Sequence, residues 1–178
     1  MSIPVPQRCF KLCLMEQDDD CCNRPYLSIY SILDQKLSPN GGPLDYAQFQ
    51  GINDISAPDF DVTGMNAPGQ IKFLQAGHYL IAYSVNGRLD SPFPQPVPSW
   101  GMSIYINGAQ IPGSASAAFS QSPDDDALCV SNNVIIPIAA NDILMLRSIS
   151  KKPILLKGIH TELVVPVAGA CLSILKVA

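Results

Sequence analysis

Glycine and proline interrupt this sequence so often that long helices are disfavoured throughout it. Sixteen prolines and twelve glycines are spread through 178 residues, and few windows repeat apolar residues with the period of an amphipathic helix. The segments between the breaks are short and rich in β-branched and aromatic residues, as strands are. There are eight such runs: YLSIYSIL (26–33), PDFDVTGM (58–65), QIKFLQAG (70–77), HYLIAYSV (78–85), SWGMSIYI (99–106), DALCVSNNVIIPI (126–138), DILMLRSI (142–149) and ACLSILKVA (170–178). The pattern predicts one all-β domain, a sandwich or barrel.

Turn chemistry between these runs predicts where the chain reverses. Three dipeptides are suited to tight turns: Asn86-Gly87, Asn107-Gly108 and Asn141-Asp142. Asn-Gly between two apolar runs is the strongest local signal for a hairpin. Asn and Asp also tolerate left-handed backbone and bond their own main chain. We therefore expect a reversal at each of the three dipeptides.

Alternation within two runs predicts which side chains share a face. In the run that begins at residue 78, one face carries Tyr79, Ile81, Tyr83 and Val85. In the final run, Cys171, Ser173 and Leu175 lie on one face, against Leu172, Ile174 and, roughly, Val177 on the other. Neither face of the final run is strongly polar, so we expect a central strand buried on both sides at an assembly interface.

The charge content limits the partners of the protein. Only 15% of the residues are charged and 47% are hydrophobic, against a usual charged share of about 25%. Part of the surface is therefore expected to meet protein rather than water. The net charge of −4 and the scattered basic residues argue against nucleic acid, which needs clustered lysine and arginine.

No targeting segment is recognised in the sequence. The start lacks a positive region followed by an apolar stretch, so no secretory signal peptide is expected. No run of about 20 apolar residues suggests a membrane span. We therefore expect synthesis in the cytoplasm. Six cysteines are many for a reducing compartment, which favours a protein later exposed to an oxidising exterior.

The sequence offers no catalytic constellation, so we do not expect an enzyme, a cofactor or a metal site. The two histidines, His78 and His160, are expected to be structural or solvent-exposed, and only a pairing of His78 with Cys129 stays open. No nucleophile elbow, zinc-protease or phosphate-loop motif occurs. The acidic runs 18–20 and 124–126 lack the spacing of a calcium loop and are expected to be solvated.

Four segments, taken in order, resemble a known family. FLQAGHYLIAYSVN, MSIYINGAQIPGSASA, NVIIPIAANDILMLRSI and ACLSILKVA are similar to the C1q/TNF-like jelly-roll domains of Bacillus-type spore surface proteins, those of the exosporium and of spore appendages. The likeness covers roughly residues 58–178 and implies a jelly roll that forms tight homotrimers. It also implies core or trimer-interface roles for four residues: Tyr79, Tyr83, Leu172 and Ile174. The family's Ala-Gly-Asp turn is here Ala-Ala-Asn-Asp (139–142).

The head of the chain, residues 1–25, is expected to be a connector arm ahead of a jelly-roll domain at 26–178. Its prolines and cysteines resemble the N-terminal connector arms of spore appendage fibre subunits. Its candidate contact residues are Ile3, Pro4, Val5, Pro6, Phe10 and Leu12. Alternating prolines preset an extended backbone, and an extended arm can add along the edge of a neighbouring sheet. Such head-to-tail contacts do not close and produce a filament.

The cysteines fall into two groups. The arm carries four candidates for intermolecular disulfides: Cys9, Cys13, Cys21 and Cys22. Free thiols and metal binding stay open as alternatives, although the spacing fits no common zinc motif. Cys129 and Cys171 lie in apolar strand contexts and are expected to be inert buried thiols.

Two functions follow from these observations. The first is a structural, trimeric subunit of a spore surface layer or appendage fibre, whose partners are its own copies and other spore surface proteins. The alternative is a recognition module that binds a surface ligand or receptor through its loops. The candidate loop for the alternative is residues 90–100, which has proline at every second position from 92 to 98.

Overall fold

The computed structural model describes residues 25–31, 34–39, 42–43, 51–56, 59–62, 69–90, 99–119, 128–156 and 169–178, with the backbone alone described for 51–56. All of the connector arm except Pro25 therefore lies outside the described residues, as do the loop at 91–98 and both acidic runs. Thirteen strands occupy the described part: β1 (Tyr26–Ser31), β2 (Gln35–Leu37), β3 (Gly51–Ser56), β4 (Phe60–Asp61), β5 (Ile71–Phe73), β6 (Gly77–Leu89), β7 (Ser99–Ile106), β8 (Ala109–Gln110), β9 (Ser116–Phe119), β10 (Leu128–Ile138), β11 (Ile143–Ser148), β12 (Ile154–Leu156) and β13 (Ala170–Lys176).

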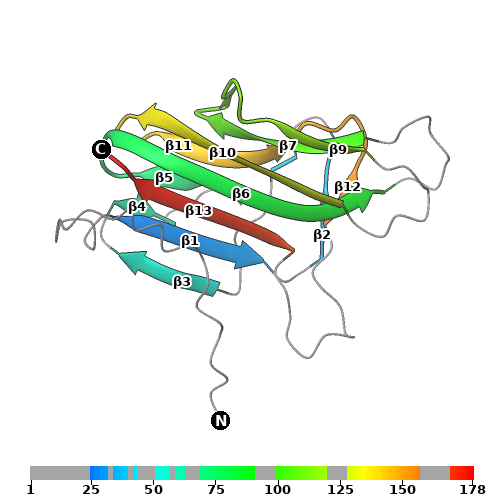
Figure 1. The fold of residues 1–178 in the computed structure, drawn as a ribbon, viewed down its shortest axis with the longest axis horizontal. Coiled ribbons are helices and arrows are strands. Elements are labelled where there is room, and N and C mark those ends of the chain that lie inside the picture. Colours follow the sequence, from blue (N-terminus) through cyan, green and yellow to red (C-terminus); the bar gives the residue numbers. More distant parts are fainter. Residues whose placement is uncertain are drawn as a thin grey trace, which may run out of the picture.

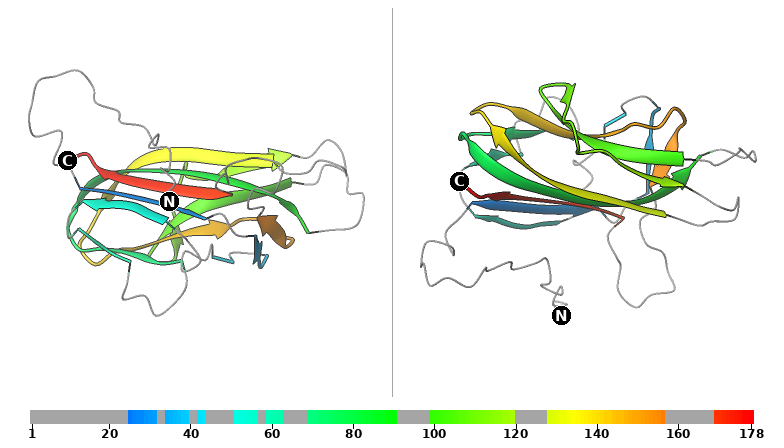
Figure 2. Two further views of the ribbon diagram at one scale, coloured as in Figure 1. Left: turned by 90° about the horizontal axis from the view of Figure 1, so that it is seen from below. Right: turned by 45° about the horizontal axis from the view of Figure 1, so that its top comes forward.

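The strands form two antiparallel sheets packed face to face (Figures 1 and 2). Sheet A has the order β2-β12-β6-β13-β1-β3, and sheet B has the order β4-β5-β11-β7-β8, with β9 also paired to β7. The long strand β6 pairs with β13 and then β12 along one edge, and with β10 along the other. Strand β13 lies between β1 and β6. The all-β prediction is confirmed, and the described residues contain no helix.

The core lies between the two sheets and comes from strict alternation in the sequence. Strands β1, β5, β6, β11 and β13 bury every second side chain. The predicted inward face of β6 is confirmed, because Tyr79, Ile81, Tyr83 and Val85 are all buried. At one end of the core, Phe60, Phe73 and Tyr79 pack edge to face, with ring centroids 4.8–5.9 Å apart.

Two of the three predicted turns are confirmed. Asn107 and Gly108 have φ of 50° and 81°, the two positive values that a tight hairpin turn requires, and they join β7 to β8. Asn141 has φ of 71° and joins β10 to β11. The two turns bond to each other, because Asn107 Nδ2 donates to Asp142 Oδ1 over 2.7 Å and the Ile143 amide donates to Asn107 Oδ1 over 2.9 Å.

The predicted reversal at Asn86-Gly87 is wrong, because β6 continues through this dipeptide to Leu89. Gly87 pairs with Leu128 of β10 on one side and with Leu156 of β12 on the other. A Cβ atom at Gly87 would lie only 2.9 Å from the Leu155 carbonyl oxygen. This glycine therefore permits close strand packing in the middle of the sheet rather than a turn.

Candidate assembly surface

The four residues predicted for the core or trimer interface all lie in the core of the single subunit. Tyr79, Tyr83, Leu172 and Ile174 are each at most 3% exposed. They point from β6 and β13 toward sheet B, so their side chains are not on the surface of the subunit. The surface of these strands is formed by the side chains between them in the sequence.

Tyr83 joins the two sheets through its hydroxyl group. The hydroxyl lies 2.9 Å from the Met102 carbonyl oxygen and 2.8 Å from the Ser114 carbonyl oxygen, and its one proton serves these two acceptors. Burial raises the pKa of Tyr83 to about 12, although a hydrogen bond with the backbone of Ser116 acts in the opposite direction. Tyr83 is therefore an uncharged side chain whose hydroxyl joins β6 to the opposite sheet.

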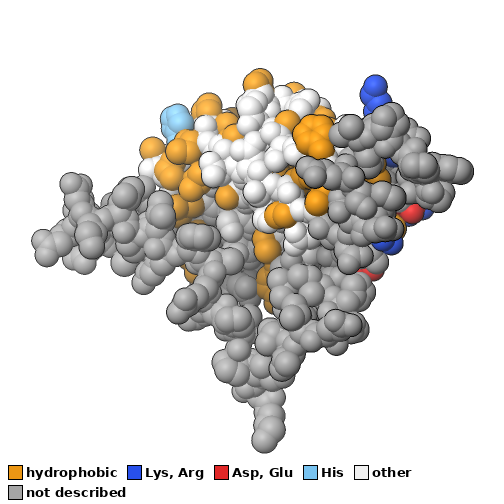
Figure 3. Space-filling view, turned by 45° about the vertical axis from the view of Figure 1, so that its right-hand side comes forward, with side chains coloured by type: hydrophobic (Ala, Val, Ile, Leu, Met, Phe, Trp, Pro, Cys, Tyr) orange, Lys and Arg blue, Asp and Glu red, His pale blue; other side chains and the backbone are white. Residues whose placement is uncertain are grey.

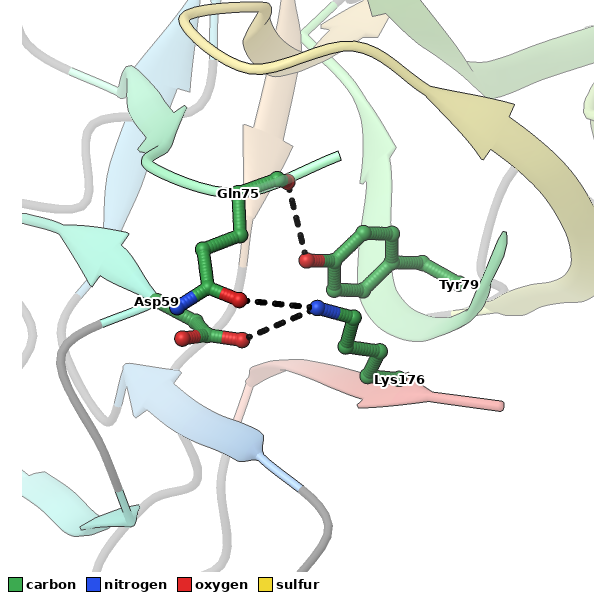
Figure 4. Close-up of polar contacts among 4 residues, drawn as sticks. All are labelled: Asp59, Gln75, Tyr79 and Lys176. Atoms are coloured by element: carbon green, nitrogen blue, oxygen red, sulfur yellow. Dashed lines mark hydrogen bonds and ion pairs between the residues drawn. The ribbon is translucent and has the colours of Figure 1, made fainter. Parts of the chain in front are cut away.

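Tyr79 lies in a second polar cluster, at the end of the sandwich where the C-terminal strand finishes (Figure 4). Its hydroxyl donates to the Gln75 carbonyl oxygen over 3.0 Å. Lys176 Nζ lies 5.8 Å from the Tyr79 ring centroid and contacts Asp59 Oδ2 at 3.5 Å and Gln75 Oε1 at 3.1 Å. Burial, and then the negative charge of Asp59, raise the pKa of Tyr79. The cluster fastens the end of β13 to sheet B.

The outer surface of sheet A presents a region that we call the neutral face. It consists of the outward-facing side chains of four adjacent strands: His78, Leu80, Ala82, Ser84 and Asn86 of β6; Cys129, Ser131, Asn133, Ile135 and Pro137 of β10; Cys171, Ser173 and Leu175 of β13; and Tyr26, Ser28 and Tyr30 of β1. None of these sixteen side chains is Asp, Glu, Lys or Arg. In Figure 3 white and orange side chains occupy the described surface, and blue and red ones lie toward one margin.

Strand register arranges the neutral face in rows that cross the four strands. One row is entirely apolar or aromatic: Ile135, Leu80, Leu175 and Tyr26. The next row carries small polar or aliphatic side chains: Asn133, Ala82, Ser173 and Ser28. Ile135 remains 62% exposed. The face thus combines exposed apolar area with short, uncharged side chains, which permits close approach by another surface.

The neutral face ends where charged residues begin on the same sheet. The next outward side chain of β6 after Asn86 is Arg88, which pairs in register with Leu155 of β12, and Leu155 pairs with Lys36 of β2. Lys36 forms an ion pair with Asp90. The change occurs within one strand, so it separates a neutral part of sheet A from a charged part.

Cys129 and Cys171 lie on the neutral face, which corrects the prediction that both are buried. Cys129 is exposed, Cys171 is half-buried, and neither is in a disulfide. Cys129 Sγ lies 3.3 Å from Ser84 Oγ. Sequence context indicated burial because both strands are apolar overall, but both cysteines fall on the outward phase of the alternation. The predicted disulfide candidates of the arm lie outside the described residues.

Within the described residues, no group of three His, Cys, Asp or Glu side chains is placed to hold a metal ion. The open pairing of His78 with Cys129 is also wrong. His78 pairs with Pro137 and Asn86 pairs with Cys129, so the two side chains lie eight strand residues apart, roughly 27 Å. The part of the chain that the structure describes holds no helix that could cross a membrane.

Solved structures share the fold of this chain at low sequence identity. Murine APRIL at pH 5.0 superposes with a TM-score of 0.55 and 10% identity, over 86% of this chain and 99% of that one. The globular domain of the zebrafish complement 1qA protein gives 0.57 and 10%, over 86% and 98%. The TNF protein Eiger from S. frugiperda gives 0.54 and 14%, over 88% and 94%. No protein-family model and no curated protein matches the sequence. The chain has a C1q/TNF-like jelly-roll fold.

Proposed function

We propose that this chain is a self-assembling structural subunit. In this proposal three copies associate through the neutral face, and the arm at residues 1–25 joins the trimers into a larger assembly on a spore surface, in an exosporium layer or an appendage. The proposal gives the protein no catalytic role. Its partners are its own copies and other spore surface proteins.

The neutral face is the observation that carries the proposal. Burying a charged side chain without a partner costs several kcal/mol, and none of the sixteen side chains of the neutral face is Asp, Glu, Lys or Arg. A second copy brings the same absence of charge, so contact between copies places no like charges against each other. Burying exposed side chains such as Ile135 contributes roughly 1–3 kcal/mol each. The neutral face is therefore suited to contact with another copy of the same chain.

The number of copies and the location rest on the family resemblance of the sequence. The resemblance implies trimers, and the C1q/TNF-like fold agrees with it at the level of architecture. The spore surface is proposed because the similar sequences belong to spore surface proteins. An assembly on a cell exterior would also accommodate six cysteines in one chain.

The reach of the arm supports its proposed role as a connector. An extended segment of 25 residues spans on the order of 80 Å, whereas a folded body of this size is roughly 40 Å across. The arm is therefore long enough to cross a neighbouring subunit. Deleting residues 2–22 should leave trimers in solution while the larger assemblies disappear from electron micrographs. Persistence of those assemblies would contradict the role of the arm.

The oligomeric state tests the neutral face directly. Light scattering after gel filtration, with reductant present, should give three times the mass of one arm-deleted chain; for comparison, three full chains of 19.1 kDa would give about 57 kDa. Leu80→Glu places a charge in the centre of the apolar row and should produce monomers. Met145→Glu is the matched control, because Met145 is a half-buried side chain on the outer surface of sheet B. The same oligomeric state in both variants would contradict the proposal.

The recognition alternative makes a different prediction with the same variants. If binding through the loop at 90–100 were the function, substitutions in that loop would remove activity while the neutral face variant would only change the oligomeric state. Replacing the four prolines at 92, 94, 96 and 98 with serine should leave assembly unchanged under the structural proposal. Loss of assembly in that variant would favour a role for the loop.

A further inference from the structure

The two cysteines of the neutral face occupy different parts of it. Cys171 lies on β13 in register with Ser84 of β6, so it is near the middle of the face. Cys129 lies on β10 and pairs with Asn86. Among the described strands β10 pairs only with β6, so Cys129 lies at the border of sheet A. One thiol is central and the other is at an edge.

The two thiols of one subunit are too far apart to bond each other. Strands β10 and β13 flank β6, so they are two strand spacings apart, about 10 Å. Cys129 and Cys171 also pair with residues of β6 that are two positions apart. This offset adds about 7 Å along the strand direction, perpendicular to the strand spacing. The Cα atoms are therefore about 12 Å apart, whereas a disulfide requires less than about 7 Å. Any disulfide of Cys129 or Cys171 must involve another segment or another subunit.

We propose that Cys129 of one subunit forms a disulfide with Cys171 of the next subunit around the trimer. The inference rests on the proposed association through the neutral face. A cyclic trimer joins two different patches at each contact, whereas a two-fold contact joins a patch to itself. An edge thiol and a central thiol provide such a pair, with the edge of one subunit lying on the face of its neighbour. Three disulfides then close a covalent ring.

The oxidation needs an external electron acceptor, and a small disulfide such as oxidised glutathione supplies it. The Cys129 thiolate attacks one sulfur of oxidised glutathione, releases one glutathione thiol and forms a mixed disulfide. The Cys171 thiolate of the neighbouring subunit then attacks the Cys129 sulfur and displaces the second glutathione. Two protein thiols lose two electrons and two protons, and one small disulfide becomes two thiols. The exposure of Cys129 allows the first attack in the free subunit.

Non-reducing gels of a chain with serine at all four arm cysteines test the proposal. After incubation with oxidised glutathione, the body cysteines alone should give a covalent trimer that returns to monomer with reductant. Cys129→Ser and Cys171→Ser, each made in this background, should both reduce the covalent species at least tenfold. A covalent dimer that persists in Cys171→Ser would show a Cys129–Cys129 contact and would overturn the proposal.

Light scattering under reducing conditions separates this inference from the proposed function. Trimers in solution without covalent species would overturn the disulfide and leave the assembly intact, whereas monomers would overturn the assembly itself. If the serine background fails to fold, the native chain still provides the test, because trypsin places Cys129 alone in residues 89–147 and Cys171 alone in residues 158–176. A linked pair of these peptides in the covalent trimer is expected, and links from either peptide only to the arm would refute the proposal.

Discussion

The two outer surfaces of the sandwich differ in where they carry charge. On sheet A, the sixteen side chains of the neutral face include no Asp, Glu, Lys or Arg, and the outward charges Arg88 and Lys36 lie beyond it. On sheet B, the outward positions include Asp61 and Lys72, which pair in register, and Arg147, whose guanidinium carbon lies 5.2 Å from the Tyr105 ring centroid. The sheets share one core and one pattern of alternation, so the difference is not required by folding. The difference is what the proposed assembly through the neutral face requires of the two surfaces.

The largest expected effect comes from giving the neutral face a charge at its centre. Ser173 lies on β13 between Ala82 and Ser28, and Ser173→Asp would bury an unpaired carboxylate in the assembled state. A cost of about 3–5 kcal/mol corresponds to association weakened more than 100-fold. Sedimentation over a concentration series measures it. Gln110→Glu on the exposed strand β8 of sheet B is the control and should change association less than threefold.

A second expected effect concerns the Tyr83 hydroxyl, which joins the two sheets. The pKa of Tyr83 is raised to about 12 in the folded chain and is about 10 in an unfolded one. Its stabilising contribution is therefore complete below pH 10 and is lost as the pH rises toward 12. The loss amounts to about 2–3 kcal/mol. Urea unfolding at pH 8 and pH 11 should show about half of this loss in the native chain, roughly 1.4 kcal/mol, because pH 11 lies midway between the two pKa values.

The Tyr83→Phe variant identifies the source of that alkaline loss. It should be less stable at pH 8 by about 1–3 kcal/mol, because Met102 and Ser114 lose a hydrogen-bond donor to their carbonyl groups. Its stability should then change less between pH 8 and pH 11 than that of the native chain. Tyr105→Phe on sheet B is the control and should keep the native pH dependence. A full alkaline loss in Tyr83→Phe would assign the effect to another group.

A smaller effect is expected from salt. Contacts between charged surfaces weaken as ionic strength rises, because screening shortens the range of the interaction. The neutral face offers no side chain to screen apart from His78, so the association constant should change less than threefold between roughly 0.05 and 0.5 M salt. A steep fall with salt would place the contact on the charged surfaces instead.

The smallest effect is expected on sheet B. Arg147→Met removes the contact between the guanidinium group and the Tyr105 ring, which is worth about 0.5–1 kcal/mol at an exposed site. Urea unfolding should detect a loss of this size, and the oligomeric state should stay the same. A change of oligomeric state in this variant would mean that sheet B also takes part in assembly, and the contrast between the two surfaces would fail.

Alternation made much of this fold predictable from the sequence. The strand at 99–106 was predicted with its observed bounds, and the inward face of β6 follows from Tyr79, Ile81, Tyr83 and Val85. Strands β2, β8 and β12 have two or three residues each, too few for a period to be visible. Those short strands form because neighbouring strands offer backbone partners to them.

The two Asn-Gly dipeptides show why local chemistry was insufficient. Both are typical of tight turns, yet Asn107-Gly108 turns and Asn86-Gly87 does not. Strand partners on both sides of Gly87 decide the second case, and they come from distant parts of the sequence. The neutral face had the same limitation. The phase of Cys171, Ser173 and Leu175 could be predicted, but which phase pointed outward depended on the position of sheet B.

The place of β13 in sheet A also bears on the order of folding during synthesis. It is the strand described last along the chain, and it lies between β1, the first, and β6. Until the ribosome has made β13, the edges of β1 and β6 that it joins have no strand between them. Contacts that wait for a distant segment slow folding. The neutral face crosses all three strands, so it is incomplete on a nascent chain that lacks β13. Under the proposed assembly, unfinished subunits would therefore not associate through this face.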